Sequence, residues 1–381
     1  MKIPYIKELD GVRGIAALMV MFFHFFFRLE TDNTFLLAVR KVSYLGETGV
    51  SLFFVLSGFL ITRILLNTRQ SERFFYHFYL RRSLRIFPLY YLFLGVYYFI
   101  FPLVKHEPYE PFSMQIAYWT YMQDFAQTFN WPSEGPGHFW SLAVEEHFYL
   151  FWPLLVYYLN NKKIRYAISG IIITAVITRW LLISSNYPYR LLTFSRMDEL
   201  AMGTLLAVLE ARGKLMQEKR NMQKFLLLFI ISVIPVALFW TNLTSLTNTS
   251  ANLFFKLTRF IILGFAYFSF IGFVITASQG LVIKKILRSP PLLYTGRISY
   301  GLYVYHPICF WLSKQFFKTD NIGVSMVLAF IFTYIIASGS YYLFEKWFLN
   351  LKKYFEYKNS NPSPELAVQP ASSANMMKRE L

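Results

Sequence analysis

Apolar blocks near 20 residues long recur along the whole chain and are separated by shorter polar or basic segments. A run of about 20 apolar residues is long enough to cross the hydrocarbon core of a bilayer as a helix. The pattern therefore predicts an all-α, polytopic membrane protein with about ten transmembrane helices. The predicted spans are residues 11–29, 48–66, 86–104, 139–159, 165–184, 191–210, 224–241, 257–277, 298–316 and 323–347.

The composition supports this fold class. Of the 381 residues, 55% are hydrophobic and only 15% are charged, against about 25% charged residues in soluble domains. No segment is polar enough and long enough to form a separate soluble domain. We expect a transmembrane domain over residues 1–348 and a flexible cytoplasmic tail over residues 349–381, where Asn, Ser and Pro are frequent.

The formal net charge of +17 would suggest nucleic acid as a partner in a soluble protein. Here the Lys and Arg residues gather in alternate connections between the predicted spans, which is the bias that cytoplasmic loops show. The basic connections are residues 67–85, 160–165, 211–224 and 278–290. This distribution predicts that both termini are cytoplasmic, in a multi-pass protein of the cell membrane, with the bilayer and not nucleic acid as partner.

Few motifs of cofactor chemistry occur in the chain. No cluster of His, Cys, Asp and Glu has the spacing of a metal site, and neither a P-loop nor a GxGxxG fingerprint is present. The predictions for the site are therefore that no metal is bound, and that its chemistry depends on ionisable side chains inside the apolar blocks.

Arg13 and His24 are the first such side chains, in the segment LDGVRGIAALMVMFFHF. Eleven helical steps are about three turns, so both side chains lie on one face of the helix, about 16 Å apart along its axis. Arg13 is then near the cytoplasmic surface and His24 deep in the bilayer. An ionisable group at such depth is costly and indicates a functional site, although a packing histidine and an interfacial arginine are the simpler alternative.

Glu145 is the second candidate. The span 139–159 enters from the outer side, so Glu145 lies about 10 Å below the outer edge, at a depth similar to that estimated for His24. A carboxylate beside an imidazole can fix its tautomer and support general-base catalysis. A structural ion pair or a hydrogen bond within the bundle is the alternative.

A basic group precedes the third span. Arg81 and Arg85 are four residues apart and share a helix face with each other, and Arg82 lies beside them. Arginine suits phosphate because it can donate two parallel hydrogen bonds. Arginine at a cytoplasmic helix end is also what topology alone requires.

Five segments together resemble the acyltransferase-3 family of integral membrane acyltransferases, over residues 5–348. They are LDGVRGIAALMVMFFHF, GVSLFFVLSGFLIT, FYLRRSLRIFPLYY, HFWSLAVEEHFYLFWP and ISYGLYVYHP. The resemblance implies ten transmembrane helices and transfer of an acyl group, often acetyl, from cytoplasmic acyl-CoA to hydroxyls of carbohydrates outside the membrane. His147 stands where the family commonly has Gln. We expect the stand-alone form, without the SGNH-type esterase-like domain that some members carry.

The resemblance also implies roles for single residues. Arg13 and His24 match essential positions, and Glu145 matches the acidic one. Arg81, Arg82 and Arg85 match a basic segment associated with CoA. Arg196 and His306 match further motifs and are candidates for binding substrate; Arg196 could equally pair with Asp198.

The predicted function is that of a membrane O-acetyltransferase in which acetyl-CoA, or another acyl-CoA, is the donor and a carbohydrate is the acceptor, with partners from glycan assembly. His24 acts as the general base, or itself carries the acyl group. A transporter or flippase of a lipid-linked sugar, with His24 and Glu145 as a proton relay, is the alternative from another class.

Overall fold

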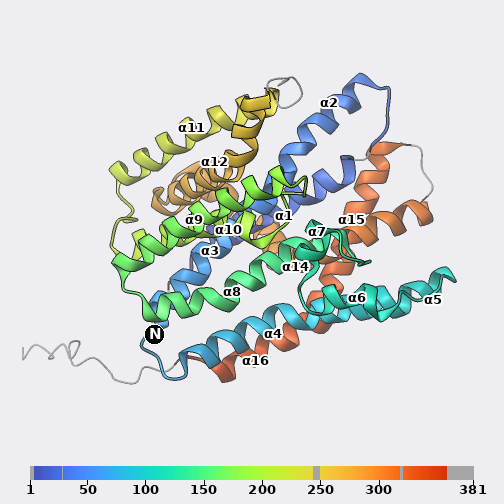
Figure 1. Ribbon diagram of the computed structural model, residues 1–381, viewed down its shortest axis with the longest axis horizontal. Coiled ribbons are helices and arrows are strands. Elements are labelled where there is room, and N and C mark those ends of the chain that lie inside the picture. The colour runs from blue at the N-terminus through green and yellow to red at the C-terminus, as the bar shows by residue number, and fades with distance from the viewer. Residues whose placement is uncertain (1–3, 28, 243–248, 318–320, 358–381) are drawn as a thin grey trace, which may run out of the picture.

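A computed structural model gives the structure of residues 4–27, 29–242, 249–317 and 321–357, and these residues form helices and connections without any strand. The all-α prediction is confirmed. The long helices are α1 (Glu8–Phe26), α3 (Gly49–Thr68), α4 (Phe74–Gly95), α8 (Trp140–Tyr158), α9 (Asn161–Ser184), α10 (Thr193–Ala211), α11 (Lys219–Asn242), α12 (Thr249–Thr276), α14 (Pro290–Phe317) and α15 (Ile322–Ser340). Each predicted span overlaps one of them. They lie side by side in one bundle (Figure 1).

Shorter helices occur at the ends of the bundle. They are α2 (Thr34–Ser43), α5 (Phe101–Lys105), α6 (Phe112–Trp119), α7 (Gln123–Phe129), α13 (Val282–Leu287) and α16 (Lys346–Leu351). A π-helical turn joins α4 to α5, and another joins α15 to α16. The predicted tail, residues 349–381, begins inside α16; a 3₁₀ turn at Lys352–Phe355 follows, and residues 358–381 lie outside the described residues.

Seven helical stretches of the described residues are long and apolar enough to cross a membrane, which makes this a multi-pass membrane protein. The stretches that contain α8, α10 and α14 are not among the seven. Side chains from these three helices line cavities inside the bundle. Their polar residues face protein rather than lipid, which explains why they are less apolar than the other long helices.

Close backbone contact fixes the neighbours of the site. A Cβ atom on Gly296 of α14 would lie 1.9 Å from the Asp10 carbonyl oxygen of α1, and one on Gly203 of α10 would lie 1.9 Å from the Val55 carbonyl oxygen of α3. Only glycine allows helices to approach so closely. The first contact aligns α1 with α14, and the second aligns α3 with α10.

The predicted basic connections meet at one end of the bundle. There Arg63 pairs with Glu210 at 2.7 Å and donates to the Pro4 carbonyl oxygen. Arg69 donates to the Tyr157 carbonyl oxygen, and Lys284 pairs with Glu8. The described beginning of the chain and α16 also lie at this end (Figure 1). We call it the inner end, because the positive-inside rule predicts that basic connections face the cytoplasm.

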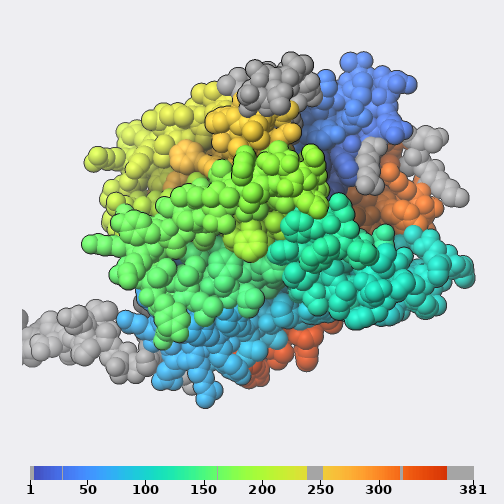
Figure 2. Space-filling view, viewed as in Figure 1, coloured from blue at the N-terminus to red at the C-terminus, as the bar shows by residue number. Residues whose placement is uncertain are grey.

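The connection 105–138 covers the outer end. It is ordered by α6, which packs against α4, and by α7, which packs against α8, and it forms the teal surface in Figure 2. The buried carboxylate of Asp124 accepts hydrogen bonds from the backbone N–H and the hydroxyl of Thr193, at the start of α10. Burial raises the pKa of Asp124, while the nearby His147 and the hydrogen bonds from Thr193 oppose that rise. The Nδ1 atom of His147 lies 2.7 Å from the Thr193 hydroxyl oxygen and 3.8 Å from the Asp124 carboxylate, so His147 helps to anchor this cap.

The close contact between α10 and α3 can be tested with Gly203→Ala. Its methyl group would have to displace the Val55 carbonyl, and such overpacking costs about 1–3 kcal/mol. The apparent melting temperature of the purified protein in detergent should fall by several degrees. Gly170→Ala in α9, where nothing lies within 4 Å of the added Cβ, is the matched control and should not lower it. Equal melting temperatures for the two variants would contradict the contact.

Candidate active site

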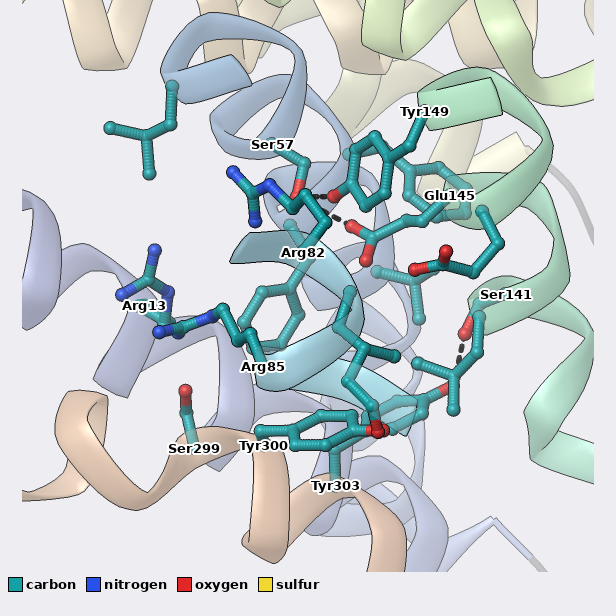
Figure 3. A pocket seen from close by; sticks show the side chains of 17 residues that line it. Arg13, Ser57, Arg82, Arg85, Ser141, Glu145, Tyr149, Ser299, Tyr300 and Tyr303 are labelled. Atoms are coloured by element: carbon teal, nitrogen blue, oxygen red, sulfur yellow. Dashed lines mark hydrogen bonds between the residues drawn. The ribbon is translucent and has the colours of Figure 1, made fainter. Parts of the chain in front are cut away.

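A cavity between α1, α3, α4, α8 and α14 holds the predicted basic group. Arg13, Arg82 and Arg85 extend into it from one side, and Glu145 faces them from α8 (Figure 3). Arg82 and Arg85 repel Arg13, while Asp10 pairs with it at 3.1 Å. We call this space the inner cavity. It adjoins a second space at the inner end, because Arg13, Leu60 and Arg85 line both.

Glu145 is held by hydrogen bonds inside the inner cavity. The Ser57 hydroxyl donates to its Oε1 atom at 2.6 Å, and the Tyr149 hydroxyl donates to Ser57 at 3.0 Å. The guanidinium of Arg82 lies 5.1 Å from the centre of the Tyr149 ring. Glu145 and Tyr149 therefore form an acidic and aromatic wall opposite the arginines.

His24 lies at the other end of this series of spaces. It lines two outer cavities together with His138 and Trp140. One is edged by Glu30, Trp311 and Lys314, the other by Glu47, Arg190 and Arg196. Tyr303 and Val50 line both the second outer cavity and the inner cavity. The spaces therefore follow one another from the basic inner end to the outer end.

Three imidazoles meet beside the outer cavities. The ring of His24 lies 4.8 Å from that of His306 and 6.4 Å from that of His138, measured between ring centres. His138 and His306 are 5.2 Å apart by the same measure. His306 is fully buried, and its Nε2 atom has no hydrogen-bond partner among the described residues.

Backbone carbonyls set the tautomers of His24 and His306. The Nδ1 atom of His24 lies 2.9 Å from the Val20 carbonyl oxygen, and that of His306 lies 2.8 Å from the Tyr303 carbonyl oxygen. A carbonyl oxygen can only accept, so Nδ1 carries the hydrogen in both rings. In each neutral ring the basic nitrogen is then Nε2.

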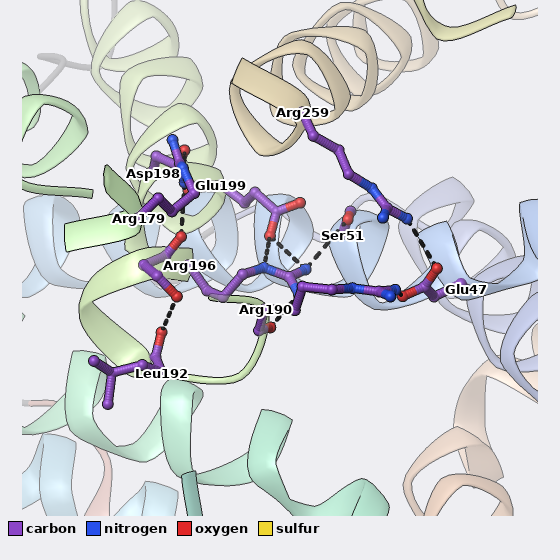
Figure 4. A network of polar contacts seen from close by, with 10 residues as sticks. Glu47, Ser51, Arg179, Arg190, Leu192, Arg196, Asp198, Glu199 and Arg259 are labelled. Carbon is purple, nitrogen blue, oxygen red and sulfur yellow. Dashed lines mark hydrogen bonds and ion pairs between the residues drawn. The ribbon is translucent and has the colours of Figure 1, made fainter. Parts of the chain in front are cut away.

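Arg196 belongs to a network of ion pairs beside the second outer cavity (Figure 4). It pairs with Glu199 at 2.8 Å and lies 3.8 Å from the centre of the Phe260 ring. Asp198, the partner considered from the sequence, pairs instead with Arg179 at 2.8 Å, and both are fully buried. Of the two alternatives left open by the sequence, the pairing of Arg196 with Asp198 is not the one that forms, because the two residues are two positions apart on α10 and point to different neighbours.

Arg190 extends the same network towards the outer surface. Its guanidinium contacts Glu47, which also pairs with Arg259 at 2.8 Å. Burial lowers the pKa of Arg190 to about 9, and the positive charges of Arg259 and Arg196 add to this effect. The network ties the 185–192 connection to α12 and to the residues before α3.

Comparison with known proteins identifies the family. A family profile described as an acyltransferase domain matches residues 6–343. The chain belongs to the acyltransferase-3 family. Similar curated proteins are the O-acetyltransferase OatA of Staphylococcus aureus (strain NCTC 8325 / PS 47), 27% identical over 363 residues, and the putative O-acetyltransferase SACOL0978 of strain COL, 29% identical over 370 residues. Each alignment covers 90% of this chain and 57% of the relative, so the chain spans little more than half of their length. No solved structure matches.

The structure places the acyltransferase-3 motifs around the spaces just described, but it separates two residues that the sequence prediction had combined. Glu145 lines the inner cavity with Arg82, whereas His24 lines the outer cavities. The depth estimate was wrong because α1 ends at Phe26, so His24 is close to its outer end. His24 is level with His138, which precedes α8, and Glu145 is seven residues farther along, about 10 Å deeper.

The basic residues also differ in their surroundings. Arg82 and Arg85 line the inner cavity, but Arg81 donates to the carbonyl oxygens of Lys352 and Phe355. The sequence analysis did not single out His138 as a site residue, although it lies within the fourth family segment, two residues before Trp140. Among the described residues, no group of His, Cys, Asp and Glu side chains is arranged as a metal site.

The buried Arg179–Asp198 pair gives a test of the network behind Arg196. Asp198→Ala leaves the Arg179 guanidinium uncompensated, which should cost about 3–5 kcal/mol. The amount of folded protein recovered from membranes, measured by size-exclusion chromatography, should fall sharply. The double variant Arg179→Leu with Asp198→Leu should recover much of it. Equal recovery of Asp198→Ala and unmodified protein would contradict the role assigned to the pair.

Proposed function

We propose that the protein is an O-acyltransferase of the cell membrane, which transfers an acyl group, normally acetyl, from cytoplasmic acyl-CoA to a hydroxyl of a carbohydrate outside the membrane. One observation carries the proposal: the cavities follow one another from Arg13 and Arg85 at the inner end to His24 at the outer end. Family membership and the names of the O-acetyltransferase relatives support the reaction class. Proteins of glycan assembly are the partners we expect.

The donor enters from the inner end. Arg82 and Arg85 bind its phosphates, with Arg13 beside them, because guanidinium groups match phosphate oxygens in geometry and charge. The extended pantetheine arm then passes through the inner cavity, between the arginines and the wall formed by Glu145 and Tyr149. The distance along α1 from Arg13 to His24 is about 16 Å, which such an arm can cover.

The acceptor enters from the outer end. The outer cavity that contains His24 is lined by Trp140 and Trp311, and flat aromatic faces suit the apolar faces of sugar rings. Its hydroxyl reaches His24 close to the outer end of α1. The bulk of a large glycan can then stay outside the membrane while a single hydroxyl reacts.

His24 is the general base in this proposal. Its Nε2 atom removes the proton from the acceptor hydroxyl as the oxygen attacks the thioester carbon. The C–O bond forms, the C–S bond breaks, and the imidazolium returns the proton to the CoA thiolate. His306 takes the supporting position that the sequence analysis gave to Glu145, since its buried ring lies 4.8 Å from that of His24, measured between ring centres, and helps to fix the orientation of that imidazole.

Two other routes fit fewer observations. In the first route His24 itself carries the acyl group before it reaches the acceptor, and the same residues take part. Incubation with labelled acyl-CoA in the absence of acceptor would then leave the label on the protein. A sugar transporter with His24 and Glu145 as a proton relay is disfavoured, because the family is one of acyltransferases and the two side chains line different cavities.

Replacement of His24 tests the base. Membranes from cells that express His24→Gln should transfer label from radiolabelled acetyl-CoA to carbohydrate at least about 10²-fold more slowly than membranes with the unmodified protein, as expected for loss of a general base. The exposed His106 of the outer connection provides the control, and His106→Asn should keep its rate. If the His24→Gln variant transferred acetyl groups as fast as the unmodified protein, the proposed mechanism would be wrong.

Replacement of Arg85 tests the donor site. Loss of a charge-assisted hydrogen bond costs about 1.5–3 kcal/mol, so Arg85→Ala should raise the KM for acetyl-CoA about tenfold or more. Lys162→Ala removes an exposed positive charge at the start of α9, near the same end, and should leave KM unchanged. If both variants raise KM alike, the effect is one of net charge and not of a phosphate site.

A further inference from the structure

Arg81 holds the C-terminal segment against α4. Its Nη1 atom donates to the carbonyl oxygens of Lys352 at 2.8 Å and Phe355 at 3.2 Å, and its guanidinium lies 5.6 Å from the centre of the Tyr357 ring. Carbonyl groups in the last turn of a helix lack partners within the helix and carry a partial negative charge. Arg81 satisfies two of them, and this contact fixes the position of the segment that follows α16.

The contact brings Lys352 to the basic group. Leu349, one helical turn before Lys352, lines the space at the inner end together with Arg13 and Arg85. Lys352 therefore lies beside this space, where the positive charges of the arginines act on its ammonium group. Lys352 is half-buried, whereas the adjacent Lys353 is exposed and lies over the ring of Tyr354. Neighbouring lysines of one short turn therefore have different surroundings.

The surroundings of Lys352 are unfavourable for its own charge, although Asp10 pairs with Arg13 and Glu145 lies near Arg82. Each cation raises the free energy of its neighbours, and partial burial weakens the screening by water. The docking of the C-terminal segment through Arg81 nevertheless holds Lys352 in place. An anion with several charges removes this repulsion, and the phosphates of the donor are such an anion.

We infer that Lys352 is a further donor-binding residue, which contacts a phosphate group of acyl-CoA at the inner mouth of the cavity, and that the C-terminal segment docked by Arg81 forms one wall of the nucleotide site. The inference rests on the proposed function. It places this contact on a segment that the sequence analysis had treated as a flexible tail.

The test compares two donors, acetyl-CoA and S-acetylpantetheine, which lacks the phosphates and the nucleotide. Lys352→Ala should raise the KM for acetyl-CoA about tenfold. This is the change expected when one charge-assisted hydrogen bond of the weaker kind is lost. Its kcat should stay within about twofold. With S-acetylpantetheine, Lys352→Ala and the unmodified protein should be indistinguishable.

Two further variants complete the experiment. Lys352→Arg should keep most of the affinity for acetyl-CoA, and Lys353→Ala should match the unmodified protein. An unchanged KM in Lys352→Ala would overturn the inference, and so would an equal loss with both donors, which would indicate structural damage. If the unmodified protein transferred acetyl from neither donor, the proposed function itself would fail, which is a different outcome.

Discussion

Every charged side chain inside this bundle must find its partner within the protein, because the surrounding hydrocarbon offers none. Arg179 meets this requirement with Asp198, Arg196 with Glu199, and Arg63 with Glu210. These pairs join α9 to α10, stiffen α10 and join α3 to α10. The architecture of the bundle follows from where such pairs can form, together with the glycines that let α3 and α10 touch.

The same requirement separates structural charges from functional ones. Arg82 and Arg85 line the inner cavity without a close ion pair among the described residues, and Glu145 and Glu146, the carboxylates that act on Arg82, line the same cavity. This arrangement supports the phosphate site proposed there, because an anionic ligand can reach both guanidinium groups. Arg13 is intermediate, since Asp10 pairs with it while Arg85 and Arg82 repel it. The charges around each buried arginine therefore distinguish structural ion pairs from candidate ligand-binding residues, which the degree of burial does not.

The long helices were predictable from the sequence because apolar length is a strong local signal. The three helices that carry Glu145, Arg196 and His306 were also predicted from the sequence, although their polar residues weaken the signal of apolar length. Depth was not predictable to better than a turn or two. The end of α1 at Phe26 moved His24 away from the level of Glu145 and towards His138.

Contacts between segments distant in the chain were beyond the sequence. Nothing local indicates that Arg81 reaches the carbonyl groups of Lys352 and Phe355, or that Asp198 selects Arg179 rather than Arg196. Such choices depend on which helices are neighbours, and neighbours are set by packing at positions such as Gly203 and Gly296. The family motifs predicted which residues matter, and the structure shows with which others they act.

Tyr303 lines both the inner cavity and an outer one, and its hydroxyl contacts Ser141 and donates to the His138 carbonyl oxygen at 2.7 Å. Tyr303 is therefore part of the partition between the spaces that the proposed mechanism assigns to donor and acceptor. Under that proposal the phenol ring limits the access of water to the thioester, and it thereby protects the acyl group from hydrolysis until an acceptor hydroxyl arrives.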